Sequence, residues 1–345
     1  MFSCPLPHHN NTYIELAYGD GGRLMSQLIN DIFLPAFGTD PSSLHDSAVL
    51  SPPQGKLAFT TDSFVVHPLF FPGGDIGSLA IHGTINDLAM SGAHPLYISA
   101  SFILEEGLEI EILRRIVNSM AQAAKQADVR IVTGDTKVVE KGKGDGIYIN
   151  TSGIGIIKHP WDINATAIQE GDAILISGDI GRHGMTIMSV REELGFSSSS
   201  GLISDSAPLH RSVHALIDRG IPIHCLRDIT RGGLSTTLHE LADASGLTFL
   251  IDEQKIPVRE DVRSACDLLG LDPLQVACEG RYSAIVPEKN ANQALKLMRT
   301  LAVSGEACRI GTVQKRDTAP LLMRGILGPI RIISMPTGTQ LPRIC

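Results

Sequence analysis

Residues 57–62 read Leu-Ala-Phe-Thr-Thr-Asp, an apolar run typical of a β-strand that leads straight into a carboxylate. Residues 129–135, Val-Arg-Ile-Val-Thr-Gly-Asp, repeat the pattern. Loops at the ends of strands can bring several acidic groups to one point while the sheet holds them rigid. We therefore expect Asp62 and Asp135 to share a ligand site, joined by Asp46, which comes just before another short apolar run.

The sequence around these runs alternates strand and helix patterns. Apolar residues spaced three and four apart predict helices at about 75–91 and 109–127, between predicted strands at 48–50, 57–61, 97–104, 129–133 and 147–157. This order indicates an α+β layer rather than a doubly wound parallel sheet.

The second half of the chain has the same mixed character. Helices are predicted near 208–219, 233–245, 259–270 and 288–301, and strands near 173–177, 247–251, 282–286, 308–313 and 326–333. Because 345 residues are many for a single core, we predict two α/β domains with additional end segments. The predicted parts are an N-terminal segment at 1–40, a first domain at 41–160, a second domain at 171–335 and a mobile tail at 336–345.

The composition excludes several classes of partner. A net charge of −8 argues against nucleic acid and anionic membranes, which favour a basic face. With 43% hydrophobic residues and a mean hydropathy of +0.11, the chain is typical of a globular protein, and it holds no apolar run long enough for a membrane helix. We expect a cytoplasmic protein with six reduced cysteines, and the absence of C-x-x-C and H-E-x-x-H gives a zinc site little support.

Asp87 is the most unusual acid in the first domain. It falls on the apolar face of the predicted helix at 75–91, where a carboxylate is costly unless it is paired or bound to a cation. Several carboxylates without soft ligands favour Mg²⁺, with Asn86 beside them. Each aspartate taken singly is more often a turn former or a helix cap, but four in one predicted domain favour the ligand interpretation.

A second motif suits the binding of phosphate. Residues 228–233, Asp-Ile-Thr-Arg-Gly-Gly, lead into a predicted helix whose first amides and dipole favour an anion. Arg231 could chelate phosphate oxygens and Thr230 could donate a hydrogen bond, although Thr230 as an ordinary helix N-cap is the simpler alternative. Neither G-x-x-x-x-G-K-[ST] nor G-x-G-x-x-G occurs. Glu279 alone is interpreted as a turn residue.

The sequence ends on Cys345, after a stretch that contains Pro336, Gly338 and Pro342. Proline and glycine disfavour helix and sheet here, so we expect an unshielded arm that carries a nucleophile. As a thiolate, cysteine attacks electrophilic carbon, and the adjacent Arg343 could lower the pKa of the thiol. The alternative is an incidental residue on a frayed end.

Taken together, five segments resemble the HypE family of hydrogenase maturation proteins across nearly the whole chain. They are FTTDSFVVHPLFFPGG at 59–74, GTINDLA at 83–89, VTGDTKV at 132–138, DITRGG at 228–233 and PRIC at 342–345. The block from Asp62 to Gly74 and the terminal PRIC are specific to HypE. The Asp and Asp-x-Thr-x-Gly-Gly motifs are shared with aminoimidazole-ribonucleotide synthetase, selenophosphate synthetase and thiamine-monophosphate kinase.

This resemblance implies an ATP-dependent carbamoyl dehydratase that makes the cyanide ligands of [NiFe] hydrogenase. In the family, the terminal thiol receives a carbamoyl group from HypF, ATP activates the amide oxygen, and loss of phosphate leaves a thiocyanate. The cyano group then passes to iron on a HypC–HypD complex. The fold implied is α+β, with two α/β domains of the PurM-like type, a barrel formed across a homodimer, and a flexible C-terminal tail.

The resemblance also assigns roles to residues. It implies that four acids hold Mg²⁺ and phosphate, that a loop borders the phosphate site while the asparagine before Asp87 contributes to nucleotide binding, and that a charged pair flanks the reacting amide. In that order these residues are Asp46, Asp62, Asp87 and Asp135; Asp228, Thr230, Arg231 and Asn86; and Lys137 with Glu279. Cys345 carries the substrate. Two departures from the family are Asp20, where the N-terminal glycine loop usually has serine, and Arg281, where lysine is common.

Two other functions remain open on the sequence. A small-molecule kinase or synthetase of the same superfamily would use the phosphate site and would not need Cys345. A non-catalytic thiol carrier would use the nucleotide only to control its conformation.

Overall fold

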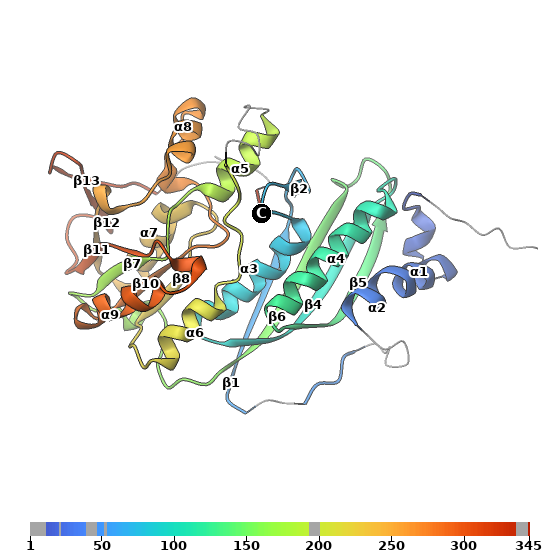
Figure 1. Cartoon of the computed structure of the whole chain (residues 1–345), viewed down its shortest axis with the longest axis horizontal. Coiled ribbons are helices and arrows are strands. Elements are labelled where there is room, and N and C mark those ends of the chain that lie inside the picture. The colour runs from blue at the N-terminus through green and yellow to red at the C-terminus, as the bar shows by residue number, and fades with distance from the viewer. Residues whose placement is uncertain (1–11, 21, 39–46, 52–53, 193–200, 336–343) are drawn as a thin grey trace, which may run out of the picture.

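The computed structural model describes residues 12–20, 22–38, 47–51, 54–192, 201–335 and 344–345. Asp46, with its predicted ligand role, lies outside these residues, as do 336–343 of the predicted tail. Figure 1 shows two α/β halves side by side, with the C-terminus between them. Among the described residues, no helix is long and apolar enough to cross a bilayer.

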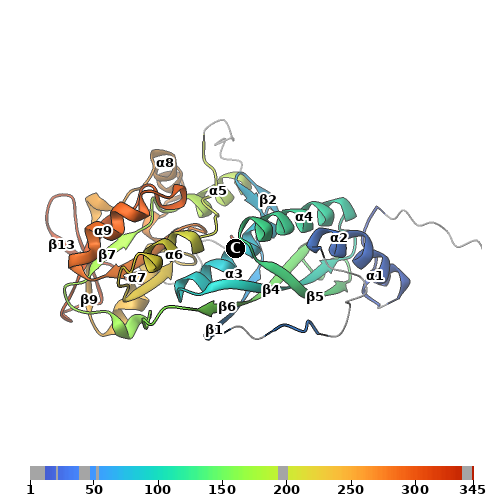
Figure 2. The ribbon, with the colours of Figure 1, turned by 60° about the horizontal axis from the view of Figure 1, so that its bottom comes forward.

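The first half is built on a four-stranded sheet in the order β1-β6-β4-β5. Its strands are β1 (Lys56–Phe64), β4 (His94–Glu105), β5 (Arg130–Val139) and β6 (Ile147–Ile157). All neighbours are antiparallel except β4 and β5. One face carries all the helices of this half, as Figure 2 shows. They are η1 (Leu16–Gly19), α1 (Arg23–Leu28), η2 (Ile29–Phe33), α2 (Leu34–Phe37), α3 (Ile76–Met90) and α4 (Ile110–Gln126), and a small hairpin of β2 (Phe70–Phe71) and β3 (Gly74–Asp75) precedes α3.

Both long helices of this half follow the predicted bounds. Asp75 caps α3 by accepting hydrogen bonds from the amides of Gly77 and Ser78, and α4 buries one apolar face. The predicted strand at 48–50 is wrong, since these residues have no regular structure. The strands β1 and β5 extend well past their predicted ends, so Asp62 and Asp135 lie within strands and not in loops that follow them.

The second half contains a seven-stranded sheet in the order β13-β12-β9-β11-β7-β10-β8. The strands are β7 (Ala173–Ile176), β8 (Cys225–Asp228), β9 (Thr248–Asp252), β10 (Tyr282–Val286), β11 (Cys308–Gln314), β12 (Leu321–Arg324) and β13 (Ile330–Ile332). The helices are α5 (Arg182–Arg191), α6 (His210–Asp218), α7 (Gly233–Ser245), α8 (Glu260–Leu269) and α9 (Glu288–Met298), with short turns η4 (Ala165–Ala167), η6 (Glu253–Lys255), η7 (Pro273–Gln275) and η8 (Ala302–Ser304).

Apolar side chains leave both faces of this sheet. On β7, Ile174 and Ile176 join a core with α7, whereas Ala173 and Leu175 join a core with α6 and α9. Strands buried on both faces read as continuous apolar runs, which is why β7 and β10 were predictable. The predicted strand at 326–333 is confirmed only in its second half, where β13 lies, because the hairpin turn between β12 and β13 occupies its first half.

Helix α3 lies between the two halves and packs against both. It covers β1 and β6 of the first sheet and also contacts α6 and β8 of the second half. Residues 202–209, which we call the crossing segment, run along this boundary: Ser204 donates its amide to the Pro72 carbonyl at 2.9 Å, and Ser206 bonds His82 of α3 at 3.0 Å. The position of the second half is thus fixed by contacts to α3 and its surroundings.

Histidines from both halves meet at the same boundary. The rings of His94 on β4 and His214 on α6 stack with centroids 3.8 Å apart, and His210 lies 6.0 Å from His214. His214 donates through Nε2 to the Ala93 carbonyl at 3.0 Å. Burial is the main cause that lowers the pKa of all three imidazoles, to about 4 for His210 and His214.

Acid is therefore expected to weaken this joint. Unfolded histidines bind protons near pH ~6.5, above the folded pKa, so the stability present above that pH is lost as the pH falls toward about 4. The variant His214→Gln can keep the hydrogen bond to the Ala93 carbonyl but cannot be protonated. We predict that its melting temperature falls less between about pH 7 and about pH 5 than that of the wild type. Equal losses in thermal melts would contradict the prediction.

Candidate functional site

A cavity of about 630 Å³ opens where the two halves meet. Its acidic, basic and thiol lining comes from five places that are distant in sequence: β1, α3, the end of β8 with the loop that follows it, the segment before β10, and the C-terminal residue. The acidic, basic and thiol side chains in the lining are Asp62, Asp87, Arg227, Asp228, Arg231, Glu279 and Cys345. Most of the residues predicted for the site are therefore brought together.

Asp62 and Asp87 face each other across the contact between β1 and α3. Asp87 accepts a hydrogen bond from the Thr60 hydroxyl at 2.7 Å. Gly83 lets the strand approach the helix, because a Cβ there would lie 2.8 Å from the Phe64 ring. Burial raises the pKa of both carboxyls, and the charge of Asp87 raises that of Asp62 further. Each would be favoured in the ionised form by a cation between them.

Asp228 and Glu279 form the deeper acidic wall. Burial, together with the neighbouring carboxylates, raises the pKa of Asp228 to about 7 and that of Glu279 well above its ordinary value. The Oε1 atom of Glu279 is buried and has no hydrogen-bond partner among the described residues. An unsatisfied buried carboxyl is costly and is typical of a group that meets a ligand.

The basic side of the cavity is the loop before α7. Arg231 is exposed and makes no salt bridge within the described residues. Helix α7 starts at Gly233 without a side-chain cap, and its N-cap is Gly232, so Thr230 is not the N-cap. Gly233 has φ +63°, and a Cβ there would lie 2.6 Å from the Leu274 carbonyl. Uncapped amides beside Arg231 suit an anion.

Cys345 is docked in this cavity, which differs from the expectation of an unshielded thiol. Its carbonyl accepts the Val65 amide at 3.2 Å, and the Ile344 carbonyl accepts from His183 Nε2 at 2.6 Å. The Ile344 side chain is 5% exposed and packs in the first core. Burial and then the Glu279 carboxyl raise the pKa of the thiol, so the docked group is protonated.

The loop that carries Glu279 is fixed to the crossing segment. The Glu279 amide donates a hydrogen bond to Asp205 Oδ1 at 3.2 Å, and a Cβ on Gly280 would collide with the Asp205 carbonyl. Arg281 is buried between Asp179, at 2.6 Å, and Asp205, at 3.9 Å. The arginine found in place of the family's lysine is thus part of a buried ion network that holds the loop.

Asn86 has a structural role that the sequence did not indicate. Its amide nitrogen donates to the Ala207 carbonyl at 3.1 Å and to the Glu279 carbonyl at 3.2 Å, and its oxygen accepts from the Leu209 amide at 2.8 Å. Both donors are occupied, so we correct the predicted role in nucleotide binding. Asn86 joins α3 to the Glu279 loop and to the crossing segment.

Asp135 and Lys137 lie apart from this cavity. They are exposed on β5, where the ammonium contacts the carboxylate at 3.1 Å. The register runs from Asp62 through Thr151 and Ala100 to Gly134, so Asp62 and Asp135 occupy nearly the same level at opposite edges of the sheet. Three strand spacings separate them by about 14 Å. One copy of the chain therefore does not bring Lys137 to Glu279.

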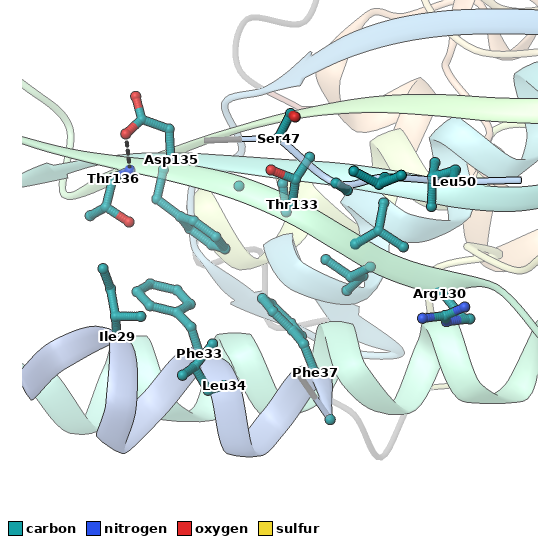
Figure 3. A pocket seen from close by; sticks show the side chains of 18 of the residues that line it. Ile29, Phe33, Leu34, Phe37, Ser47, Leu50, Arg130, Thr133, Asp135 and Thr136 are labelled. Atoms are coloured by element: carbon teal, nitrogen blue, oxygen red, sulfur yellow. Dashed lines mark hydrogen bonds between the residues drawn. The ribbon is translucent and has the colours of Figure 1, made fainter. Parts of the chain in front are cut away.

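A second cavity, of about 890 Å³, lies on the β5 side. Figure 3 shows Phe33 and Phe37 of the N-terminal helices on one wall and Ser47, Thr133 and Asp135 on the other. Its wall of aromatic and aliphatic side chains beside polar groups suits a flat organic ring. Asp20 is exposed, and the neighbouring Gly19 contacts Val138 of β5. The loop in which Asp20 replaces the family's serine therefore lies on the β5 side of the sheet.

No cluster of three or more histidine, cysteine or acidic side chains among the described residues has the geometry of a metal site. Asp62 and Asp87 nevertheless supply two carboxylates in a polar cavity. Mg²⁺ is commonly held by one or two carboxylates together with phosphate oxygens. The donor set therefore fits a metal that arrives with a nucleotide.

Several side chains at the site were missed from the sequence. They are Thr60, His183, Asp205 and Arg227. His183 and Asp205 act through contacts across more than 70 residues of sequence, and no local pattern signals such pairs. Thr60 could have been found, because it precedes Asp62 by two residues and shares its strand face.

Comparisons with known proteins agree with this geometry. The family model described as AIR synthase related protein, N-terminal domain, matches residues 44–157, and that of the C-terminal domain matches 169–321. The carbamoyl dehydratase HypE of Azotobacter vinelandii is 50% identical over 336 residues, covering 97% of this chain and 98% of that protein. The chain belongs to the HypE family of carbamoyl dehydratases.

Solved HypE structures share the fold. A HypE in complex with ATP superposes with a TM-score of 0.91 at 48% identity, covering 96% of this chain and 99% of that one. A HypE–HypF complex gives a TM-score of 0.78 at 44% identity and covers 91% and 100%. The expected family and its two domains of the AIR synthase type are confirmed for this chain.

Gly280→Ala is expected to destabilise the chain and to displace Glu279, because the new methyl group meets backbone that cannot rotate away. Overpacking of this kind costs about 1–3 kcal/mol. Gly305→Ala is the control, since a Cβ there makes ordinary contacts at 3.6 and 3.8 Å and φ is −60°. Urea denaturation of both variants checks the prediction; equal stabilities would contradict it.

Proposed function

We propose that this chain dehydrates a carbamoyl group carried on Cys345 as a thiocarboxamide and converts it to a thiocyanate at the expense of ATP, as a step in [NiFe] hydrogenase maturation. The observation that carries the proposal is the docked Cys345, which shares one cavity with Glu279, Asp62, Asp87 and Arg231. A group carried on the thiol would be held next to an unpartnered carboxyl and next to donors for phosphate.

The cavity suits the chemistry because oxide is a poor leaving group and phosphate is a good one. In the proposed reaction the amide oxygen attacks the γ-phosphoryl of ATP, ADP leaves, and one N–H proton is released. The resulting imidate phosphate then loses its second N–H proton as the C–O bond breaks, giving the nitrile and phosphate. Glu279 is proposed to accept a proton from nitrogen, and Arg231 with the first amides of α7 to stabilise phosphoryl charge.

Mg²⁺ would be held by Asp62 and Asp87, together with Asp46 and Asp135 and the nucleotide, and would supply neutralisation of phosphate charge. Asp228 and Thr230 border the same region and orient the phosphoryl group in this proposal. Burial is the main cause that raises the pKa of Asp62, Asp87 and Asp228, and a positive charge held among these carboxyls would favour their ionised forms, which supports a metal and nucleotide site here.

A homodimer would resolve the separation of the charged pair. The first sheet carries helices on one face only, and Leu57, Phe59 and Ile103 are 62%, 69% and 43% exposed. A second copy across this sheet would cover that apolar surface and form the barrel implied by the family. It would also bring Lys137 and Asp135 of one copy toward Glu279 and Asp62 of the other, where an ammonium would favour ionised Glu279.

In this arrangement ATP would place its base in the cavity beside Phe33 and its phosphates toward the Cys345 cavity.

The proposed partners are HypF, which loads the carbamoyl group, and a HypC–HypD complex, which accepts the cyano group on iron. A HypE–HypF complex among the similar structures supports the first partner. We place the reaction in the cytoplasm, because it needs both ATP and a reduced thiol, and we propose that 336–345 act as the moving arm.

The mass of the C-terminal peptide, before and after ATP, tests the reaction. Glu279→Gln is expected to accept the carbamoyl group normally and then to convert it to thiocyanate at least ~10²-fold more slowly, because the proton acceptor is lost. Cys345→Ala is expected to bind nucleotide and to accept no carbamoyl group.

Loss of one water from the loaded peptide supports the proposal. ATP turnover by Cys345→Ala on a soluble substrate would favour a small-molecule kinase, and the absence of ADP formation by the loaded protein would favour a non-catalytic carrier.

The shared site predicts complementation between two inactive variants. If Asp62 and Asp135 of different copies form one site, Asp62→Asn and Asp135→Asn homodimers are each inactive, whereas mixed dimers contain one intact site and one doubly altered site. Refolding the two variants together should restore about a quarter of wild-type dehydration, by random pairing. A mixture as inactive as its components would contradict the shared site.

A further inference from the structure

His183 is a buried histidine that touches the docked end of the chain. It lies on α5 and is fully buried. Its Nε2 is 2.6 Å from the Ile344 carbonyl oxygen, and its Nδ1 is 2.8 Å from the Ser204 hydroxyl. Because a carbonyl only accepts, Nε2 carries the proton, and Nδ1 accepts from Ser204. The Ser204 oxygen also accepts the Ser206 amide at 3.1 Å, which fixes the serine.

These contacts give His183 a single function in the docked state. Its ring meets Phe71 edge-on at 5.4 Å, and burial lowers the imidazole pKa, so the ring is neutral. It contacts the backbone one residue before the thiol and does not line the cavity that holds the reacting groups. His183 is therefore placed to position Cys345 and not to exchange protons with a group on it.

The other contacts of the two terminal residues have different properties. The Ile344 side chain contributes apolar burial, which has no direction, and the Val65 amide holds the Cys345 carbonyl from the first half. The His183 bond is the polar side-chain contact in this set and comes from the second half. Together the two polar contacts fix the backbone on both sides of the boundary.

We propose that His183 is the positioning residue that sets the fraction of chains whose Cys345 is docked for dehydration. The inference rests on the proposed function, in which the thiol must also leave the cavity to be loaded. A single neutral hydrogen bond shifts such an equilibrium by about two- to tenfold. That is large enough to set the fraction docked and small enough to keep the exchange reversible.

Two near-isosteric substitutions separate the tail contact from the Ser204 contact. In His183→Gln the amide nitrogen can replace Nε2 and donate to Ile344, whereas in His183→Asn the side-chain oxygen can replace Nδ1 and accept from Ser204. The probe is iodoacetamide on the full chain without nucleotide, with labelling of Cys345 followed by the mass of the C-terminal peptide. Because the docked thiol is partly buried and its pKa is raised by burial, it reacts more slowly than an undocked thiol, and the labelling rate follows the undocked fraction.

The expected result is about two- to tenfold faster labelling in His183→Asn and a rate near wild type in His183→Gln. His82→Asn is the matched control, since His82 is a mostly buried histidine that contacts the same crossing segment through Ser206 and, within the part of the chain that the structure describes, has no hydrogen bond to Ile344 or Cys345. Its labelling rate should be unchanged. Wild-type labelling in the Asn variant, or equal acceleration in the Gln and Asn variants, would overturn the proposal. Thermal melts identify any variant whose labelling reflects unfolding.

A second readout connects positioning to the reaction. In carbamoyl-loaded protein, single-turnover dehydration should fall about two- to tenfold in His183→Asn and recover in His183→Gln, while carbamoyl loading is not slowed. The labelling assay needs neither nucleotide nor a carbamoyl group. A chain without dehydratase activity would therefore contradict the proposed function, and labelling would still decide the role of His183.

Discussion

The crossing segment, residues 202–209, is the constraint on which the rest of the site depends. Its backbone lies so close to Gly280 that no side chain fits between them, and Asp205 within it balances the buried charge of Arg281. Removing one member of a buried ion pair leaves an uncompensated charge, which costs far more than the pair contributes. The same segment bonds α3 through Asn86 and supports His183 through Ser204. Glu279 and the docked terminus thus share one fixed support.

This arrangement explains why polar groups are numerous at a boundary that could have been apolar. Hydrogen bonds and ion pairs have direction, and a misplaced partner leaves a buried group unsatisfied. One relative position of the two halves is therefore much more stable than positions slightly displaced from it. Apolar cores on both faces of the second sheet supply the stability, and the polar boundary supplies the geometry of the cavity.

The sequence predicted the features that depend on local rules. The bounds of α3 follow from its apolar spacing, and the structure adds the N-cap at Asp75; β6 shows the alternation of more and less buried residues that is typical of a half-buried strand. The nearness of Asp62 and Asp87 was also predictable, because a carboxylate on a core face needs a partner. The placement of Asp62 and Asp135 inside strands was not, since polar residues near the end of a half-buried strand also suit a loop.

What could not be predicted depends on contacts across long sequence separations. Asn86 was interpreted as a ligand because it precedes Asp87, yet three backbone groups from the second half occupy its side chain. Glu279 was recognised only through the family resemblance, since its burial arises from a loop whose position Asp205 fixes. The docking of Cys345 likewise depends on His183, more than 160 residues away, and a stretch rich in proline and glycine gives no sign of it.

The Cys345 thiol is partly buried in the cavity beside Glu279. The cavity that would process a group on Cys345 is also an environment in which the bare thiol is protonated and a poor nucleophile. In the proposed cycle, loading and dehydration therefore cannot take place in the same position of the cysteine. The order of events follows from where the sulfur is, without a separate regulator, and an unloaded chain at rest protects its own reactive atom from stray electrophiles and oxidants.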